Sequence, residues 1–187
     1  MSKIDPDKPL PQIHQREIVA KSGLFRVERI DLEFANGATR QFERMAGSGR
    51  GAVMIVPFID SHTVLLVREY AAGTHSYQIG FPKGLIDPGE NALQAADREL
   101  MEEVGYGAKF LEKIHRVSMA PTFFNATMDI VVAENLYEQR LEGDEPEPLE
   151  VIPWSLHDAD ALLAREDFVE ARSIAALFLA QKWLRDR

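Results

Sequence analysis

The 187-residue sequence lacks cysteine altogether. Disulfides, thiolate zinc sites and cysteine nucleophiles are therefore excluded together. Long apolar runs are missing as well, because the longest uncharged apolar stretches, Ala52–Ile59 and Ile174–Ala180, fall far short of the roughly 20 residues that span a bilayer. Residues 1–12 contain charges and prolines where a signal peptide needs an apolar segment. We expect a cytoplasmic protein with no membrane partner.

Positive charge is scarce, since 21 lysines and arginines stand against 30 aspartates and glutamates and the formal net charge is −9. Such an acidic chain is a poor electrostatic match for long nucleic acid. A small anionic ligand would need local positive charge or a bound metal ion. The hydrophobic content of 45% is that of an ordinary globular protein. We therefore expect a small-molecule partner and no nucleic-acid partner.

Length and patterning predict an extended lead-in over residues 1–13 and a single domain over residues 14–187. Alternating apolar residues and turn signals predict strands over 15–21, 24–34, 39–45, 52–59, 63–70, 76–81, 109–119 and 128–133. Helical spacing and cap residues predict helices over 91–104, 155–165 and 167–184. Strands and helices in this mixed order favour an α/β or α+β sandwich.

Three local patterns add detail to this layout. Asn36-Gly37 predicts a type I′ turn, in which both residues have positive φ. The apolar phase shifts within residues 24–34, which predicts a β-bulge near Glu28–Arg29. The glycine-rich segment Gly47–Gly51 has no strand–helix context and is typical of a connector, although Arg50 within it could reach a phosphate.

The strongest chemical signal begins at Gly84 and ends at Gly105, with the spacing G-x5-E-x7-R-E-U-x-E-E-x-G, where U is aliphatic. On a helix, Glu99, Glu102 and Glu103 fall within about 100° of one another. None of the three has a lysine or arginine four residues further on. The adjacent apolar stripe consists of Leu93, Ala96, Leu100 and Val104. Clustered carboxylates of this kind are the ligands that Mg²⁺ prefers when it acts on a phosphate.

Two interpretations of these glutamates stand side by side. A solvated acidic helix face is the commoner fate of a charge run. The full spacing favours a functional site, because it should arise by chance in under about one in a million chains of this composition. The segment is similar to the Nudix box, and the chain resembles the Nudix hydrolases. Tyr106 stands where the family's box ends in an aliphatic residue.

The resemblance implies a Nudix-fold α/β/α sandwich with a mixed sheet and N-terminal antiparallel strands. It also implies a hydrolase that uses Mg²⁺, or Mn²⁺ in its place, while water attacks phosphorus in a nucleoside diphosphate linked to another group. The implied metal ligands are Glu99 and Glu103, helped by Glu102 and by the backbone carbonyl near Lys83–Gly84. The implied pair that orients the loop and helix consists of Glu90 and Arg98.

Further segments resemble the ADP-ribose pyrophosphatase branch of the family. Arg68 lies in a segment, VREYAAG, similar to one whose arginine holds the ligand, and Pro121 lies near the proline that marks the branch. Arg68 also shares a strand face with apolar residues, so a structural salt bridge is an equal alternative. Lys83 departs from the P-A-G that usually precedes the box.

Within that branch the chain resembles the ADP compounds hydrolases, on the segments Lys83–Glu90, Ser118–Pro121 and Leu141–Pro148. This resemblance implies ADP-ribose, diadenosine polyphosphates and NADH as substrates, with release of AMP. It also implies a homodimer that pairs through the strands in residues 14–45. The alternatives are a nucleotide-sugar pyrophosphatase of the same fold and a non-catalytic ligand sensor, against which the three crowded carboxylates argue.

The acidic, proline-broken segment Glu142–Pro148 has two interpretations. It is either a solvated linker or the source of the general base, because box glutamates that all bind metal leave none to accept the proton of the attacking water. Members of the branch supply that carboxylate from a loop at about this point in the chain. We favour Glu145 over Glu147, and Glu102 comes next.

Overall fold

The computed structural model describes residues 7–47 and 49–187, and its contacts group into two compact units. One unit comprises the described residues up to Gly49 together with Ala120–Ala126. The other comprises Arg50–Met119 and Thr127–Arg187. This grouping divides the range 14–187, over which the sequence predicts a single domain.

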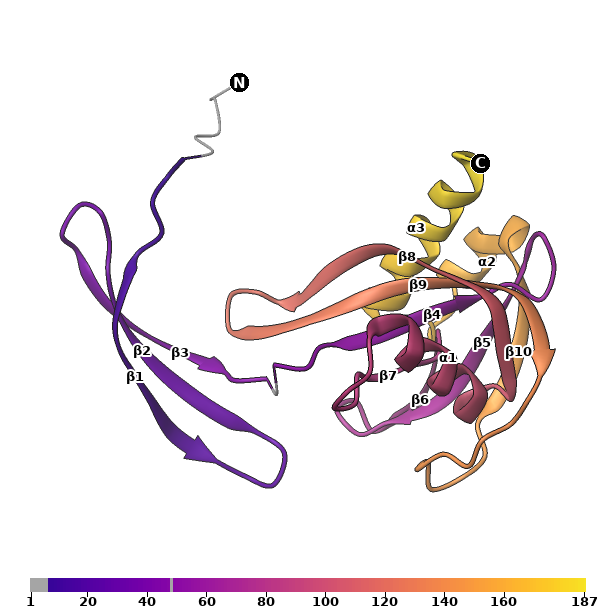
Figure 1. Ribbon diagram of the computed structural model, residues 1–187, viewed down its shortest axis with the longest axis horizontal. Coiled ribbons are helices and arrows are strands. Elements are labelled where there is room, and N and C mark those ends of the chain that lie inside the picture. Colours follow the sequence, from indigo (N-terminus) through magenta and orange to yellow (C-terminus); the bar gives the residue numbers. More distant parts are fainter. Residues whose placement is uncertain (1–6, 48) are drawn as a thin grey trace. The chain divides into compact units, whose positions relative to one another are not determined.

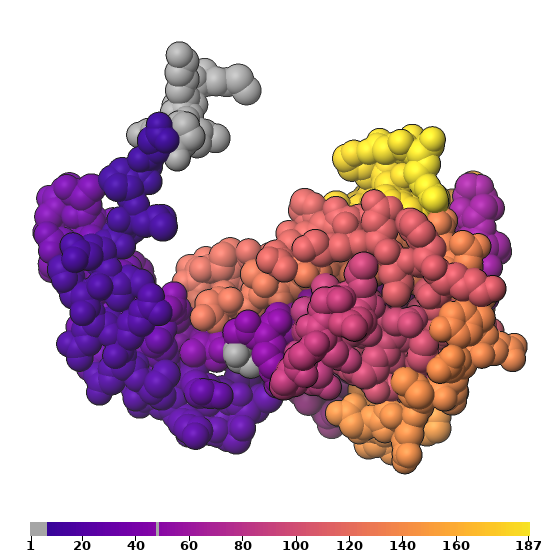
Figure 2. Space-filling model, viewed as in Figure 1, coloured from indigo at the N-terminus to yellow at the C-terminus, as the bar shows by residue number. Residues whose placement is uncertain are grey.

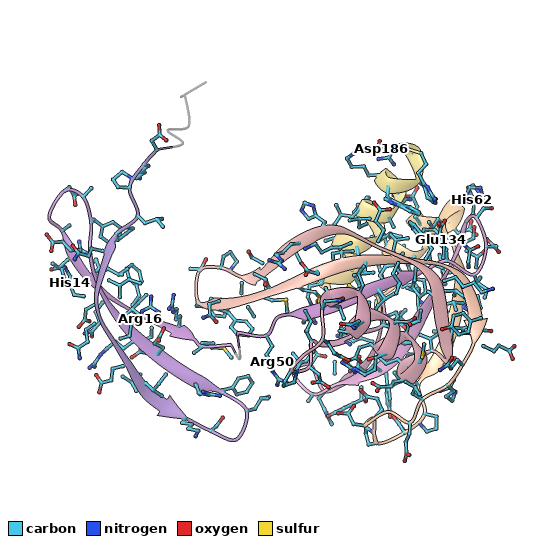
Figure 3. All side chains as sticks on the ribbon, in the orientation of Figure 1. His14, Arg16, Arg50, His62, Glu134 and Asp186 are labelled. Carbon is cyan, nitrogen blue, oxygen red and sulfur yellow. The ribbon has the colours of Figure 1, made fainter. Side chains whose placement is uncertain are left out.

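The N-terminal unit is built on the antiparallel strands β1 (Gln12–Lys21), β2 (Arg26–Glu33) and β3 (Thr39–Met45), with β2 between the other two (Figure 1). Every residue of β1 is exposed, and its polar side chains, such as His14 and Arg16, are labelled in Figure 3. Part of the lead-in predicted over residues 1–13 thus belongs to a strand, and residues 1–6 lie outside the described part of the chain.

The turn between β2 and β3 is not the predicted type I′ turn. Gly37 has a φ of 80°, but Asn36 does not have a positive φ. The Gly37 N–H donates to the Phe34 carbonyl at 2.8 Å, and the Phe34 N–H donates to the Ala38 carbonyl at 2.9 Å. This pattern is a longer hairpin loop that ends in a left-handed glycine. The prediction was wrong because Asn-Gly occupies the end of this longer loop rather than the whole turn.

The bulge predicted near Glu28–Arg29 is also wrong. β2 keeps a continuous register against β3 over Val27–Glu33. The register shifts lie instead in β1, at Ile13/Gln15 and at Ile18/Ala20. A phase shift of apolar residues in one strand does not say which of two paired strands carries the extra residue, and here its partner does.

The larger unit contains a mixed sheet around β4 (Ala52–Pro57). β4 runs parallel to β9 (Phe124–Glu138) on one side and antiparallel to β7 (Lys83–Leu85) on the other. β9 also pairs with β8 (Tyr106–Ala120). β7 was not predicted, because three residues are too few to reveal an alternating pattern.

A second, antiparallel sheet has the order β10 (Glu150–Ser155), β5 (Thr63–Ala71) and β6 (Ser76–Gly80). β10 was not predicted, since Pro153 interrupts its alternation and lowers its apparent strand propensity. The register places Pro153 opposite Leu65 of β5. β10 is an edge strand of this sheet among the described strands, and edge strands tolerate a proline, which has no N–H.

The helices are α1 (Ala92–Glu103), α2 (Ala159–Leu163) and α3 (Ala171–Arg185), with a short 3₁₀ turn, η1, at Leu156–Asp158. The helix predicted over 155–165 is therefore shorter than expected, because Ser155 still belongs to β10. The helix predicted over 167–184 starts later, because the Glu170 side chain caps it by accepting the Ser173 N–H at 2.8 Å. No helix among the described residues is long and apolar enough to cross a membrane.

Alternation along β4 shows how the larger unit is layered. Met54 and Val56 belong to the apolar cluster that contains α2 and α3, whereas Val53 and Ile55 belong to the cluster that contains α1. Because successive residues of a strand point to opposite faces, helices cover both faces of the mixed sheet. The expected α/β sandwich with a mixed sheet and N-terminal antiparallel strands is confirmed. This layering holds the C-terminal half of α1, with Glu99 and Glu103, beside β7, where the site is built.

Candidate active site

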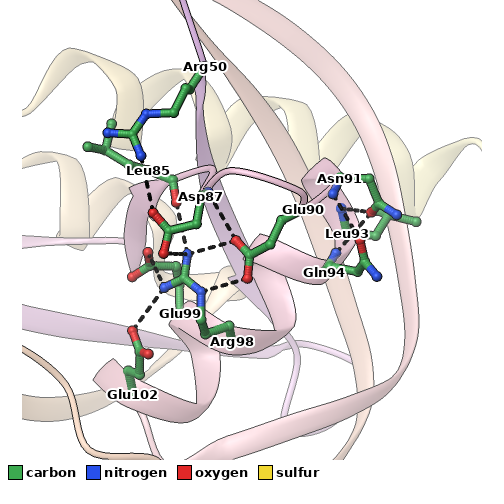
Figure 4. Close-up of polar contacts among 10 residues, drawn as sticks. All are labelled: Arg50, Leu85, Asp87, Glu90, Asn91, Leu93, Gln94, Arg98, Glu99 and Glu102. Carbon is green, nitrogen blue, oxygen red and sulfur yellow. Dashed lines mark hydrogen bonds and ion pairs between the residues drawn. The ribbon is translucent and has the colours of Figure 1, made fainter. Parts of the chain in front are cut away.

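Local capping determines where α1 begins and ends. The Asn91 side chain accepts the N–H groups of Leu93 and Gln94, and the Gln94 side chain accepts the Asn91 N–H in return (Figure 4). Gly105, with a φ of 86°, follows the helix end. The predicted helix and its caps are confirmed. Its buried stripe differs from the predicted one, since Ala95 and Met101 are buried and Leu93 is 37% exposed.

Arg98 is the centre of the polar network (Figure 4). Its Nε and Nη2 donate to the two oxygens of Glu90 at 2.9 and 3.0 Å. Its Nη1 donates to Glu99 at 2.8 Å and to Glu102 at 3.0 Å. The Leu85 carbonyl accepts a further bond from Nη2 at 2.9 Å. The expected orienting pair is thus in contact, and Arg98 ties the loop before α1 to the helix itself.

These contacts correct one point of the sequence analysis. Glu99 and Glu102 have no basic residue four positions later, yet Arg98 precedes both and neutralises them from the other direction. The hydrogen bonds from Arg98 lower the pKa of Glu90. Burial nevertheless raises the pKa of Glu99, and Arg98 opposes that rise.

Glu103 is the most enclosed carboxylate of the set. It is 7% exposed and accepts the Lys83 backbone N–H at 3.1 Å. Burial raises its pKa to about 8, while the charge of Lys83 acts in the opposite direction. The Lys83 ammonium is paired with Glu69 of β5. The side chain of Lys83 was not among the predicted site groups, although its departure from the usual box preface was the signal that could have identified it.

Gly84 is in close contact with the carboxylate of Glu99. A Cβ added at Gly84 would lie 2.0 Å from both the Cδ and one oxygen of Glu99. Real Cβ contacts do not come this close, so only glycine fits while Glu99 holds its position. The backbone of β7 and the carboxylate of α1 are therefore close neighbours, and their role as metal ligands stays a prediction.

A cleft of about 840 Å³ lies over these groups. Its acidic lining residues from the box are Asp87, Glu99, Glu102 and Glu103, and those from the loop before β10 are Glu142, Asp144, Glu145 and Glu147. Figure 2 shows that loop in orange on the surface of the larger unit. The loop thus brings its carboxylates to the same cleft as the box, and both predicted base candidates line it.

Glu145 and Glu147 differ in their surroundings within the loop. Partial burial, followed by the negative charges of Glu69 and Asp144, raises the pKa of Glu145. Glu147 instead accepts a hydrogen bond from the Tyr77 hydroxyl at 2.5 Å. Tyr77 was not predicted, because no local pattern links a residue of β6 to a loop 70 residues away in the sequence.

The two predicted substrate-binding arginines lie outside the lining of the cleft. Arg68 pairs with Glu150 at 3.5 Å and lies over the ring of Tyr77. Arg50 pairs with Asp87 of the box loop at 3.3 Å, as Figure 4 shows. The salt bridge offered as the alternative for Arg68 is present, and substrate binding by either arginine stays a prediction.

The donor set suits a hard divalent cation in its chemistry. Among the described residues, no three acidic or histidine side chains already have metal-ligand spacing, because Glu99 and Glu102 share the Arg98 guanidinium and Glu103 accepts the Lys83 N–H. Burial raises the pKa of both Glu99 and Glu103. Crowded, partly buried carboxylate oxygens whose charge is disfavoured are groups that a cation stabilises, so these residues fit Mg²⁺ or a similar ion.

Comparisons with known proteins agree with this geometry. Residues 11–44 match the family model of the NudE-type Nudix hydrolase N-terminal domain, and residues 49–178 match that of the NUDIX domain. The chain is 55% identical to ADP compounds hydrolase NudE of Escherichia coli, over 94% of each chain. It is 30% identical to an ADP-ribose pyrophosphatase of Bacillus subtilis, over 87% of this chain and 91% of that one.

A solved structure extends the likeness to three dimensions. The crystal structure of an ADP compounds hydrolase superposes with a TM-score of 0.90 at 53% identity, and the match covers 97% of this chain and 98% of that one. The Nudix fold expected from the sequence is therefore confirmed. With both family models matched and the box network in place, the chain belongs to the Nudix hydrolase family and is a Nudix hydrolase of the NudE type.

Proposed function

We propose that this enzyme is a metal-dependent pyrophosphohydrolase of ADP compounds, which cleaves the diphosphate linkage of ADP-ribose, diadenosine polyphosphates and NADH and releases AMP. The observation that carries the proposal is the row formed by Glu99, Glu102 and Glu103 in a cleft that the acidic loop also lines. The similarity to ADP compounds hydrolase NudE and to an ADP-ribose pyrophosphatase supports the substrate class.

The residues that would hold Mg²⁺, or Mn²⁺ in its place, are Glu99 and Glu103, with Glu102 and the Gly84 carbonyl. When bound there, the ion would supply positive charge to neutralise the diphosphate and to lower the pKa of a water molecule. Arg98 holds Glu90, Glu99 and Glu102 in one network, so it keeps the ligand-bearing helix aligned with the loop before it.

Glu145 is the general base in this proposal. It takes the proton of the attacking water as the new phosphorus–oxygen bond forms and the anhydride bond breaks. A carboxylate that is partly buried near Glu69 and Asp144 binds a proton more readily than an exposed one, which suits that task. Glu147 has its carboxylate engaged by Tyr77. Glu102 is the next choice.

A substrate panel read by chromatography tests the function. ADP-ribose, diadenosine triphosphate and NADH, each with Mg²⁺, should yield AMP, and a GDP-linked sugar should be hydrolysed much more slowly. Preference for the GDP-linked sugar would identify a nucleotide-sugar pyrophosphatase instead. Absence of any hydrolysis with Mg²⁺ or Mn²⁺, together with measurable ADP-ribose binding, would identify a ligand sensor.

The protein is also proposed to be a homodimer that pairs through the strands of residues 14–45. The exposed large apolar side chains of this region support the proposal, and they include Ile18, Leu24, Phe25 and Phe42. Apolar side chains on exposed strands favour association, because burying them removes apolar surface from water.

A further inference from the structure

The acidic loop is attached to the second sheet through the side chain of Tyr77. The Tyr77 hydroxyl donates to Glu147 at 2.5 Å, and Tyr77 lies on β6, opposite Tyr70 of β5. The hydrogen bond to Glu147 raises the pKa of Tyr77, so the hydroxyl remains a donor at neutral pH. Glu147 lines the cleft, whereas Tyr77 does not. Tyr77 therefore touches the loop from outside the site.

A second contact strengthens this attachment. The guanidinium of Arg68 lies over the Tyr77 ring, 5.3 Å from its centroid, and pairs with Glu150 at 3.5 Å. Glu150 is the first residue of β10, three positions after Glu147. The end of the loop is thus held at two nearby points by side chains from neighbouring strands. A cation over the face of an aromatic ring is attracted to it, which favours the ring position seen here.

The prolines of the loop extend the restraint on Glu147 to the residues nearer the middle of the loop. Glu145 and Glu147 each precede a proline, Pro146 and Pro148. Proline fixes its own φ and disfavours the helical region for the residue before it, so all four residues have few backbone conformations. When Glu147 is held, the position of Glu145 two residues earlier is restricted as well.

We propose that Tyr77 is a positioning residue for catalysis, which holds Glu147 so that the proline-stiffened loop presents Glu145 to the cleft. This inference rests on the proposed function and assigns separate roles to the two glutamates of the loop. Glu147 anchors the loop, Glu145 accepts the proton, and Arg68 supports the ring of Tyr77. The predicted ligand-binding role of Arg68 is then not needed to explain its place beside Tyr77.

The first test compares Tyr77→Phe with Tyr70→Phe. Both substitutions remove one hydroxyl from paired tyrosines of the same sheet, but the Tyr70 hydroxyl is bonded to His75 at 2.7 Å and not to the loop. Tyr77→Phe should lower kcat for ADP-ribose by about tenfold with KM nearly unchanged, because a displaced base loses transition-state contact only. Tyr70→Phe should remain near wild type in both constants. Equal kcat for both variants would overturn the proposal.

The second test asks whether Tyr77 and Glu147 act as one unit. Glu147→Ala should lower kcat about as much as Tyr77→Phe, and the double variant should lose no more than either single one. Glu147→Gln should retain most of the activity, because its amide oxygen still accepts the phenol hydrogen. The assignment would be overturned if the two reductions in kcat multiplied in the double variant. It would also be overturned if Glu147→Gln were as inactive as Glu147→Ala, since Glu147 would then be a reacting group.

A third measurement does not depend on turnover. Hydrogen–deuterium exchange of the full chain should be faster over residues 142–149 in Tyr77→Phe than in wild type or Tyr70→Phe, because the loop opens more often without its anchor. Unchanged exchange there would overturn the anchoring. Should the wild-type enzyme hydrolyse no ADP compound, the proposed function fails, and the exchange experiment still decides whether Tyr77 holds the loop.

Discussion

At the scale of single residues, burial separates the roles of the box carboxylates. Glu90 accepts two bonds from Arg98 and has a lowered pKa, which makes it a permanent anion for orientation. Glu99 and Glu103 are more enclosed and have raised pKa values. The two predicted principal metal ligands are therefore carboxylates whose negative charge is disfavoured in the absence of a cation.

The first prediction concerns those two ligands. Glu103→Gln and Glu99→Gln should each lower kcat by at least about 10³, because each removes a negative oxygen that would hold the ion beside the reacting phosphate. Thermal melting should stay near wild type, since burial disfavours the charged form of both carboxylates and glutamine has nearly the same size. Asp97→Asn on the same helix, which keeps an acceptor for the Ala108 N–H and lies outside the cleft lining, serves as the control. Normal turnover at saturating Mg²⁺ would contradict the metal site.

Glu145 provides the second prediction. Glu145→Gln should lower kcat by about 10²–10⁴, the usual scale for loss of a general base, while the affinity for Mg²⁺ stays nearly constant. Isothermal titration with Mg²⁺ and steady-state kinetics from pH 6 to 9 measure the two effects separately. Glu142→Gln, from the same loop, is the matched comparison. Wild-type turnover of Glu145→Gln across that pH range would move the base to Glu102.

Gly84 gives the third prediction. Gly84→Ala should leave the fold intact, because the three atoms nearest to the added Cβ all belong to the flexible end of the Glu99 side chain. That carboxylate has to move, and kcat should fall by about 10² because misplacing a catalytic group by an ångström has an effect of that size. Gly73→Ala, where a Cβ meets nothing within 4 Å, is the control. Full activity of Gly84→Ala would show that Glu99 need not lie where it does.

At the scale of secondary-structure elements, an ion pair between the exposed Arg116 and the buried Asp129 joins β8 to β9. Asp129 is 3% exposed and accepts two bonds from Arg116, at 2.6 and 2.9 Å. These bonds lower the pKa of Asp129 below its ordinary 3.8. A carboxyl whose pKa is lower in the folded state stabilises the fold above its unfolded pKa, and this contribution is lost as the pH falls through the folded value.

The fourth prediction follows from that pair. Asp129→Asn should reduce the free energy of unfolding at pH 7 by about 1 kcal/mol, since the charge of the accepting group is lost while solvent around Arg116 screens the pair. The difference from wild type should shrink below about pH 4, where the wild-type carboxyl also becomes protonated. Urea unfolding of both proteins at pH 7 and below about pH 4 measures this difference in the free energy of unfolding. Asp167→Asn, whose partner Arg165 binds it at a more exposed site, should have a smaller effect. Equal losses at the two sites would contradict the role of burial.

Elements with local signals were predictable from the sequence, and elements defined by distant partners were not. α1 could be placed because the residues that start and end it lie in the same stretch of sequence: Asn91 and Gln94 form its N-terminal capping box, and Gly105 follows its C-terminal end. β10 and β7 could not, because a proline in one and the short length of the other hide their alternation. The same limit applies to the site, where the box glutamates follow from spacing while the Tyr77 contact depends on the pairing of β6 and β10 with β5 in one sheet.

At the scale of the whole molecule, charge sets the conditions for binding. The chain carries a net charge of −9, and its cleft has more acidic than basic lining residues. A diphosphate is itself an anion, so its binding depends on the few cations near the cleft and on bound metal. Lys83, Arg98 and Arg140 are the basic residues of the lining. Arg98 already donates through every nitrogen to the box, which leaves metal charge as the main attraction for substrate.

The fifth prediction concerns assembly. β1 is exposed along its whole length and pairs only with β2 among the described strands, while Leu24 and Phe25 are 81% and 51% exposed. Such a surface favours a second copy of the chain, because two-fold symmetry lets one apolar patch cover its equivalent. Light scattering at micromolar concentration should give twice the chain mass, and Phe25→Glu should shift it toward the monomer. Phe178→Glu, at a similarly exposed apolar residue of α3, should remain dimeric. A wild-type monomer at that concentration would contradict the homodimer, and dissociation by Phe178→Glu would move the interface away from the N-terminal strands.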